Sequence, residues 1–201
     1  MKTKKIFILT VLISTFIVSC SVFKQITNIS RLKFKLNSVS NFRLSGIDIS
    51  NFTSYKEFSV LEAAQLLNSF TKSSFPVSFN LNVEAYNPND GGGYPRQDLD
   101  IVDFKWRLLF DGVETLSGNI DRPISVPGTG ETTIFPIRIE FDLYKFFSDK
   151  GFDGLINLAL KLGGKRSDLS SIILKAKPTI QTPFGKITYP DEIEIIHKEF
   201  N

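Results

Sequence analysis

Residues 77–89 are VSFNLNVEAYNPN, in which apolar and polar side chains alternate before an Asn-Pro-Asn turn. Successive side chains of a β-strand point to opposite faces, so this alternation predicts a half-buried strand. Pro88 cannot donate to a sheet ladder and the flanking asparagines favour turns, so the strand is expected to end there. The face expected to be buried carries Val77, Phe79, Leu81, Val83 and Ala85.

The same period of two precedes and follows this strand. Residues 32–36 and 42–49 alternate around a bulge or bend at Gly46. Residues 101–118 form two alternating runs that are separated by Asp111-Gly112. An Asp-Gly pair between such runs indicates a hairpin, so two adjacent antiparallel strands are expected there.

Further strands are expected towards the carboxyl terminus. After a turn at residues 127–130, Pro-Gly-Thr-Gly, residues 133–141 alternate again. Pro136 lies inside this run and favours an edge position, because proline cannot donate to a neighbouring strand. Two more strands are expected at 172–176 and 187–196, joined through Pro178 and a turn at residues 183–185.

Two stretches change to helical spacing. Ser59-Val60-Leu61-Glu62 has the form of a capping box, in which the serine oxygen accepts from an early helix amide and the glutamate reaches back. A helix is therefore expected over residues 59–71, with apolar residues Val60, Ala63, Ala64, Leu67 and Phe70 at helical spacing. Residues 142–162 predict one or two helices that are interrupted near Gly151 and stopped by Gly163-Gly164.

Together these elements predict a mainly β fold. A single antiparallel β-sandwich with added helices near residues 59–71 and 142–162 accounts for the whole pattern. No low-complexity tract, internal repeat or linker interrupts residues 31–201, so one domain is expected there.

The amino terminus has the layout of an export signal. Lys2, Lys4 and Lys5 precede an uncharged, largely apolar run from Ile6 to Val18. A helix that spans a bilayer needs about 20 apolar residues, so a permanent membrane helix is the weaker interpretation. Export followed by cleavage is expected.

Ile17-Val18-Ser19-Cys20 resembles a bacterial lipobox, which implies that Cys20 is lipidated and becomes the new amino terminus. Residues 1–19 would then be the signal peptide and residues 20–30 a tether to the fold. The alternative is an ordinary signal or uncleaved anchor with an incidental cysteine. Because Cys20 is the only cysteine, no disulfide can form within the chain.

Charge argues against one class of partner. The whole chain has 24 Lys and Arg against 21 Asp and Glu, but three of the lysines lie in the signal. The mature part is therefore neutral, and it has no basic stripe of the kind that nucleic-acid binding requires. Nucleic acid is not an expected partner.

Several of these motifs together resemble a known family. The strand and Asn-Pro-Asn turn of residues 77–89, the hairpin with Trp106, then Gly118 and the turn at 127–130 look like the type 2 late-embryogenesis-abundant domain, also called the water stress and hypersensitive response domain. The resemblance implies a β-sandwich of immunoglobulin or fibronectin type and supplies no catalytic residues. The helices near 59–71 and 142–162 depart from the simplest form of the family.

Few residues suggest chemistry. His197 is the only histidine and lies near the chain end, where a general base is not expected. The glycines at 91–93 and 163–164 lack the spacing of a phosphate-binding loop. Five residues offer oxygen ligands near one loop, without the spacing of an EF-hand: Asn89, Asp90, Asp98, Asp100 and Asp103. The sequence therefore predicts a non-enzyme without catalytic residues, metal or cofactor.

Two functions remain open. The first is a membrane-anchored lipoprotein that protects the cell envelope under stress or acts as a scaffold there. The alternative is a module that binds or transfers a lipid or other amphiphile, because the two apolar helical stretches could cover a groove, although ordinary core packing explains the same pattern. Expected partners are the membrane, through Cys20, and an envelope protein or amphiphile. Ser21, without an acidic run beside it, resembles lipoproteins placed in the outer membrane facing the periplasm.

Overall fold

The computed structural model describes residues 32–92, 95–182 and 185–200. One group of strands is β1 (Lys33–Leu44), β2 (Ile47–Asp48), β3 (Pro76–Tyr86) and β7 (Thr132–Asp142). The other is β4 (Leu99–Phe110), β5 (Val113–Gly118), β6 (Ile124–Val126), β8 (Ile172–Thr182), β9 (Gly185–Thr188) and β10 (Ile193–Ile195). The helices are η1 (Tyr55–Glu57), α2 (Val60–Thr71), α3 (Leu143–Phe147), η2 (Ser148–Lys150), α4 (Gly151–Gly163) and η3 (Leu169–Ser171).

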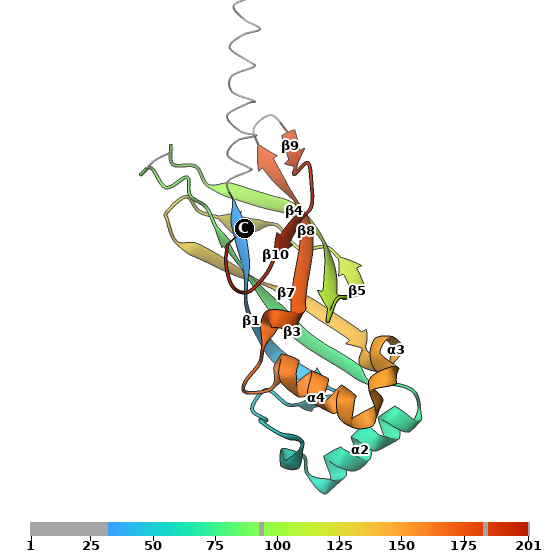
Figure 1. Ribbon diagram of the computed structural model, residues 1–201. Helices are drawn as coiled ribbons and strands as arrows, with labels where there is room; N and C mark the ends of the chain where they lie inside the picture. The colour runs from blue at the N-terminus through green and yellow to red at the C-terminus, as the bar shows by residue number, and fades with distance from the viewer. Residues whose placement is uncertain (1–31, 93–94, 183–184, 201) are drawn as a thin grey trace, which may run out of the picture.

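The strands form two antiparallel sheets (Figure 1). Sheet A has the order β2-β1-β3-β7, and sheet B has the order β10-β8-β4-β5, with β6 beside β4 and β9 beside β8. The fold is therefore mainly β, with two sheets and added helices, as the sequence predicts. Asp111 and Gly112 have φ angles of 50° and 79°, which are the left-handed values that a tight hairpin turn requires.

The helices complete the second layer of the sandwich. Near the start of β1, Phe104 of sheet B packs against Phe34 and Phe135 of sheet A, with ring centroids 5.5 Å apart in both pairs. Towards the end of β1, α4 lies on that strand, and Phe146 of α3 packs against Phe141 of β7. Sheet A thus has sheet B over one half and helices over the other, at the end of the molecule opposite the start of β1 (Figure 1).

Close packing of α4 on β1 depends on Gly163. A Cβ atom at this position would overlap the ring of Phe42, which is fully buried and stacked on Phe79. The helix stops at Gly163-Gly164 as the sequence predicts, with Gly163 as the last residue of α4 and Gly164 as its C-cap. The main structural role of Gly163 is to let the helix approach the sheet.

Replacing Gly163 with alanine is expected to destabilise the protein by about 2–3 kcal/mol, because the helix must shift away from a ring that has no room to move. Urea denaturation followed by circular dichroism measures this loss. Gly92→Ala is the control, since its added Cβ meets only the side chain of Asp90. Equal losses in the two variants would contradict the packing explanation.

The carboxyl-terminal strands differ from the prediction. The prediction of one strand over residues 187–196 is wrong. The chain forms two short strands there, β9 and β10, with Pro190 between them. Pro178, expected to join two strands, lies inside β8. The carbonyl of Pro178 accepts from the N–H of Tyr189 at 2.9 Å, so the backbone of Pro178 faces the break between β9 and β10. No described strand pairs with β8 at this break, so the N–H that proline lacks costs no hydrogen bond of the sheet.

Helix α2 has the predicted capping box but not the expected burial. Ser59 Oγ accepts from the N–H of Glu62, and the Glu62 carboxylate accepts from the N–H of Ser59 at 2.8 Å. Leu66 is the buried residue of the helix. The apolar residues predicted at helical spacing, which begin at Val60, instead lie largely on the surface. Core packing therefore does not explain why these positions are apolar.

Candidate functional site

The predicted lipidation site, Cys20, lies outside the described residues, as do the signal and the tether, so these stay predictions. Within the described ranges, no helix combines the length and hydrophobicity that crossing a membrane requires.

The residues considered for chemistry have local structural roles. His197 is exposed, and its Nδ1 lies 3.0 Å from the carbonyl oxygen of Leu36. Asp90 accepts from the N–H of Gly92 at 2.9 Å, and Asp103 accepts from the amide of Asn119. The part of the chain that the structure describes contains no group of three His, Cys, Asp or Glu residues placed to hold a metal.

The motifs behind the family resemblance meet in a buried polar cluster. Asn87, which is fully buried, donates to the carbonyl oxygens of Gln97 at 2.8 Å and Val126 at 3.0 Å. Its own oxygen accepts from the backbone and side chain of Asn89. A Cβ at Gly128 would overlap the carbonyl oxygen of Asn89, so the two turns pack backbone against backbone. These residues hold the turns together, and both polar atoms of the Asn87 side chain are used in doing so.

Trp106 and Gly118, also in the quoted motifs, form a second packing contact. They face each other across β4 and β5, and a Cβ at Gly118 would come within 2.6 Å of the indole ring. Glycine is required here because the large ring occupies the space above it.

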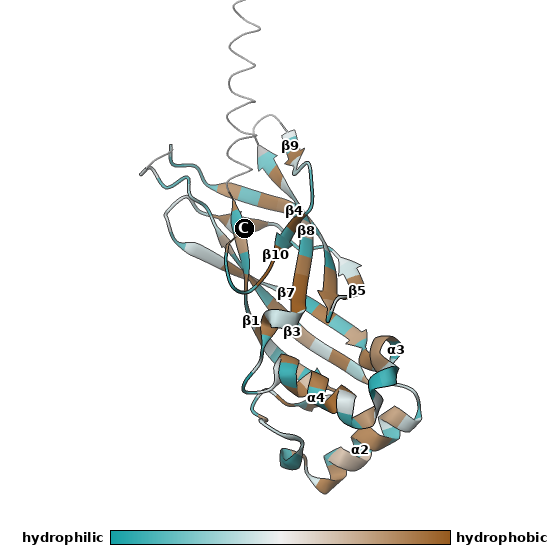
Figure 2. Ribbon diagram, in the orientation of Figure 1, coloured by the Kyte–Doolittle hydropathy of each residue, from teal (hydrophilic) through white to brown (hydrophobic). Residues whose placement is uncertain are grey.

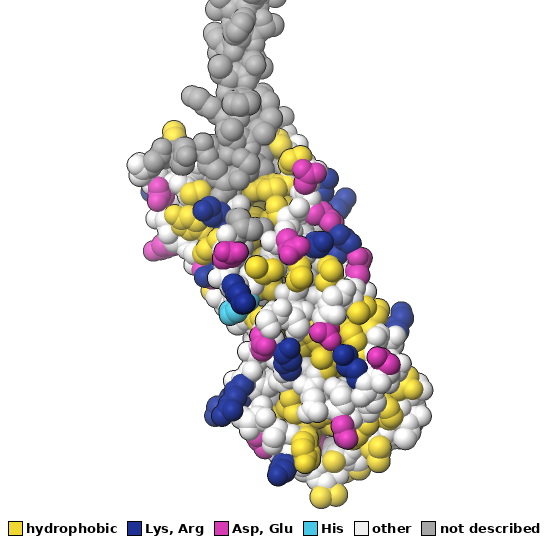
Figure 3. Space-filling model, in the orientation of Figure 1, with side chains coloured by type: hydrophobic (Ala, Val, Ile, Leu, Met, Phe, Trp, Pro, Cys, Tyr) yellow, Lys and Arg dark blue, Asp and Glu magenta, His cyan; other side chains and the backbone are white. Residues whose placement is uncertain are grey.

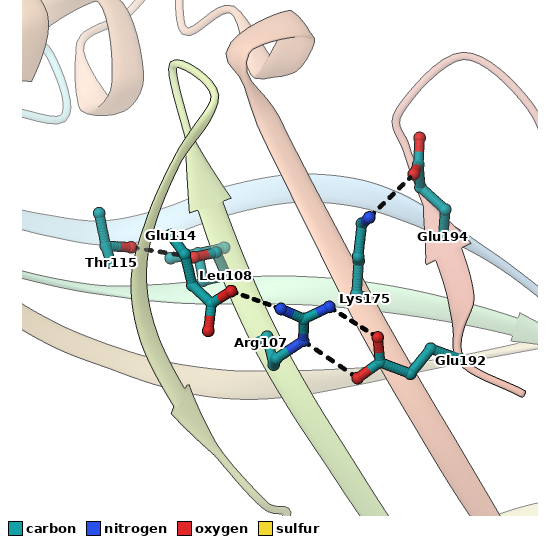
Figure 4. Close-up of polar contacts among 7 residues, drawn as sticks. All are labelled: Arg107, Leu108, Glu114, Thr115, Lys175, Glu192 and Glu194. Atoms are coloured by element: carbon teal, nitrogen blue, oxygen red, sulfur yellow. Dashed lines mark hydrogen bonds and ion pairs between the residues drawn. The ribbon is translucent and has the colours of Figure 1, made fainter.

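An ion-pair network lies on the outer face of sheet B (Figure 4). Arg107 binds Glu192 through two hydrogen bonds, Nε to Oε1 at 3.0 Å and Nη2 to Oε2 at 2.7 Å, and also pairs with Glu114 of β5. Hydrogen bonding to Arg107 lowers the pKa of Glu192. Lys175 pairs with Glu194 at 3.8 Å. The network fastens the carboxyl-terminal segment across β8 onto β4, so we assign it a structural role.

Exposed apolar side chains gather at the helical end. Of six large hydrophobic residues exposed in the described ranges, four lie on η1 and α2. Their exposed fractions are 62% for Tyr55, 90% for Val60, 79% for Leu61 and 52% for Leu67. Figure 2 shows α2 as largely hydrophobic, and Figure 3 shows hydrophobic side chains clustered at this end. Such a cluster marks a binding surface more often than scattered exposed residues do.

A groove opens beside this cluster, with a volume of about 390 Å³. Its lining is mainly apolar and comes from η1, α2, α4 and Phe58: Tyr55, Phe58, Ala63, Leu66, Phe152, Asp153, Ile156 and Asn157. Ligand pockets in proteins commonly measure about 300–1,000 Å³ and combine apolar walls with a few polar groups. The groove fits that description.

Local contacts fix the walls of the groove. Phe70 of α2 packs edge-on against Phe152 of α4, with centroids 5.5 Å apart. The carboxylate of Glu57 accepts from the backbone of Thr53 at 2.8 Å and from its hydroxyl, which lowers the pKa of Glu57 and holds η1 in place. The groove is therefore bordered by two helices and a braced turn.

The sequence predicts helix α2 but not this groove. One signal was available: apolar residues occupy most of the circumference of α2, with Leu66 and Phe70 on the packed side and Val60, Leu61 and Leu67 on the outer side. A helix packed along one side cannot bury such a pattern. The position of α4, which closes the groove, depends on contacts far apart in the sequence.

Comparisons with known proteins leave the family open. No family model matches the sequence, and no curated protein matches it. Among the solved structures that align with this chain, three have TM-scores of 0.38, 0.30 and 0.34. A protein named as late embryogenesis abundant (LEA), solved in solution, is 19% identical over 92% of this chain and 83% of its own, with a TM-score of 0.38. A protein from Archaeoglobus fulgidus is 13% identical over 82% of this chain and 99% of its own, with a TM-score of 0.30. The ApaA protein from Bordetella pertussis is 7% identical over 84% of this chain and 94% of its own, with a TM-score of 0.34.

Proposed function

We propose that this chain is a lipid-anchored, non-catalytic protein of the bacterial cell envelope that binds the apolar part of an amphiphile. The observation that carries this proposal is the groove between η1, α2 and α4, next to the exposed apolar residues of α2. Each methylene group removed from water contributes about 0.8 kcal/mol, so an acyl chain gains from covering these surfaces. An amphiphile is thus the ligand class that matches the groove.

The polar residues of the groove indicate which head groups fit. Asp153 and Asn157, both on α4, line the groove among apolar neighbours. The carboxylate repels an anionic head group, whereas the amide can donate to and accept from a neutral one. We expect neutral or cationic amphiphiles to bind in preference to anionic ones.

The lipid on Cys20 is not the expected occupant. Residues 20–32, fully extended, reach about 40 Å at 3.3–3.6 Å per residue. Strand β1 starts at the opposite end of the molecule from the helices and by itself covers a similar length. The tether would have to run back along the whole strand, so a separate amphiphile is the better candidate.

Two measurements on the full chain test the binding proposal. Native mass spectrometry after detergent exchange should show co-purified lipid, and an environment-sensitive acyl probe should bind saturably with one site per chain. Absence of both signals would remove amphiphile binding from consideration.

Replacing Cys20 with alanine is expected to release the protein from membranes, because the lipid would be its main attachment. Membrane fractionation and mass measurement of the amino-terminal peptide check this. Ser21→Ala serves as the neighbouring control and should stay acylated and membrane-bound. A Cys20→Ala variant that still fractionates with membranes and carries acyl chains would contradict the lipoprotein assignment.

Scaffolding or stress protection in the envelope is the second candidate. It is favoured by the buried cluster of Asn87, Asn89 and Gly128, because the motifs that resemble the water stress domain act together as one structural unit. Gene deletion should lower survival after drying or osmotic shock. Unchanged survival together with an intact envelope would exclude it.

A further inference from the structure

The strand β7 leaves one edge of sheet A open. Among the described strands it pairs with β3 alone, along its full length from Thr132 to Asp142. Its even-numbered residues from 132 to 140 are exposed, while Phe135, Ile137 and Ile139 are buried. A long regular edge of this kind is a template for another strand.

The hydrogen bonds around Pro76 show which backbone groups point outward. The N–H of Ser45 donates to the carbonyl of Pro76, so the backbone of Pro76 faces away from β7. Pro76 lies opposite Asp142, and Asn82 lies opposite Pro136. Because N–H and C=O of an antiparallel strand residue point to the same side, the even-numbered residues of β7 direct both groups to the free edge.

The charged side chains on this edge are complementary to those on the same edge of a second copy of the chain. Arg138 and Glu140 are both highly exposed and lie on the same face of the strand, with Nη2 and Oε2 3.5 Å apart. If two β7 strands run antiparallel about Ile139, each Arg138 faces Glu140 of the other strand. Both residues also present N–H and C=O groups at the edge, so each such pair can exchange two backbone hydrogen bonds.

We propose that β7 is a dimerisation edge, which pairs with β7 of a second copy of this chain about a two-fold axis at Ile139. The pairing joins the two copies of sheet A into one continuous sheet. The register at Ile139 is favoured by charge, because it places each Arg138 opposite Glu140 of the other strand. Pro136, which has no N–H, then lies opposite Asp142 at the ends of the pairing, so its missing bonds fall outside the central pairs. A two-fold pair of this kind closes and does not propagate.

Sedimentation equilibrium of the full chain in detergent tests this proposal. We expect a concentration-dependent equilibrium between monomer and dimer. Arg138→Glu and Glu140→Arg should each weaken dimerisation about tenfold, because each change places like charges opposite each other twice. The combined variant restores opposite charges and should recover affinity to within about threefold. Lys161→Glu, at an exposed ion pair on α4, is the control and should dimerise like the original chain.

Other results would overturn the proposal. A chain that stays monomeric at every concentration would show that Pro136 and the charges protect the edge from pairing, which is the other known use of such residues. A dimer that tolerates both single reversals uses another surface, and open-ended assembly contradicts the two-fold arrangement. Probe binding at the helical groove should be the same in all these variants, so the outcome is independent of the proposed amphiphile function.

Discussion

Replacing Asn87 with aspartate is expected to lower the free energy of unfolding by about 4 kcal/mol at pH 7, and by much less at pH 4. The two side chains have the same shape, so the variant changes hydrogen bonding and charge without changing packing. At pH 7 the new carboxylate would lie where the amide nitrogen now donates to the carbonyl oxygens of Gln97 and Val126. One oxygen of the buried charge would keep the bonds from Asn89, but the other would face two acceptors with no donor.

The pH dependence follows from the titration of the new carboxyl group. An aspartate in the unfolded chain has a pKa of about 3.9, and burial beside two carbonyl oxygens raises the pKa in the folded state. Well below a pH of about 3.9 the group is neutral in both states, and its O–H can donate to one carbonyl. As pH rises above that value, only the unfolded state ionises, so the variant loses about 1.4 kcal/mol per pH unit until the folded group also ionises.

Urea denaturation of variant and original protein at matched pH values between about 3.5 and 8 measures this difference. Asn87→Ala should lose about 3 kcal/mol at every pH, because it leaves buried partners unpaired without adding a titrating group. Asn80→Asp is the matched control on the outer face of β3, opposite Arg138, and should change stability little. A pH-independent loss in Asn87→Asp would show that the cluster is not as closed as its hydrogen bonds indicate.

Local patterns were sufficient to predict most of the strands. The alternation of residues 77–89 gives β3 and its buried face, the Asp111-Gly112 pair gives the hairpin of β4 and β5, and Pro136 gives the edge position of β7. Each of these depends on side-chain direction or backbone geometry over a few residues. Such properties are present in the sequence before any tertiary contact forms.

Features that depend on distant contacts could not be predicted in the same way. Gly163 has the sequence context of a helix end, and only the ring of Phe42, far along the chain, makes it a close-packing site. Pro178 is tolerated inside β8 because the facing segment is broken there. Likewise, the sequence predicts that α2 is a helix. Which side of α2 is exposed depends on the positions of α4 and sheet A, which the sequence pattern does not give.

Replacing Ala63 with phenylalanine is expected to weaken binding of an acyl probe at least about tenfold. Ala63 lines the groove on α2, so a phenyl ring there occupies space and apolar surface that the probe would use. Ala64, the next residue on the same exposed turn, does not line the groove. Ala64→Phe is therefore a matched control with the same change in size, hydrophobicity and helix propensity, and it should bind the probe normally.

Probe fluorescence titration separates the two variants, and thermal unfolding verifies that both keep the fold. A tenfold loss corresponds to about 1.4 kcal/mol, which is the value of roughly two methylene groups that no longer find an apolar wall. If both variants lose binding equally, the probe adheres to the exposed apolar surface of α2 in general. If neither loses it, the groove is not the binding site. Only a loss confined to Ala63→Phe assigns the acyl chain to the space between α2 and α4.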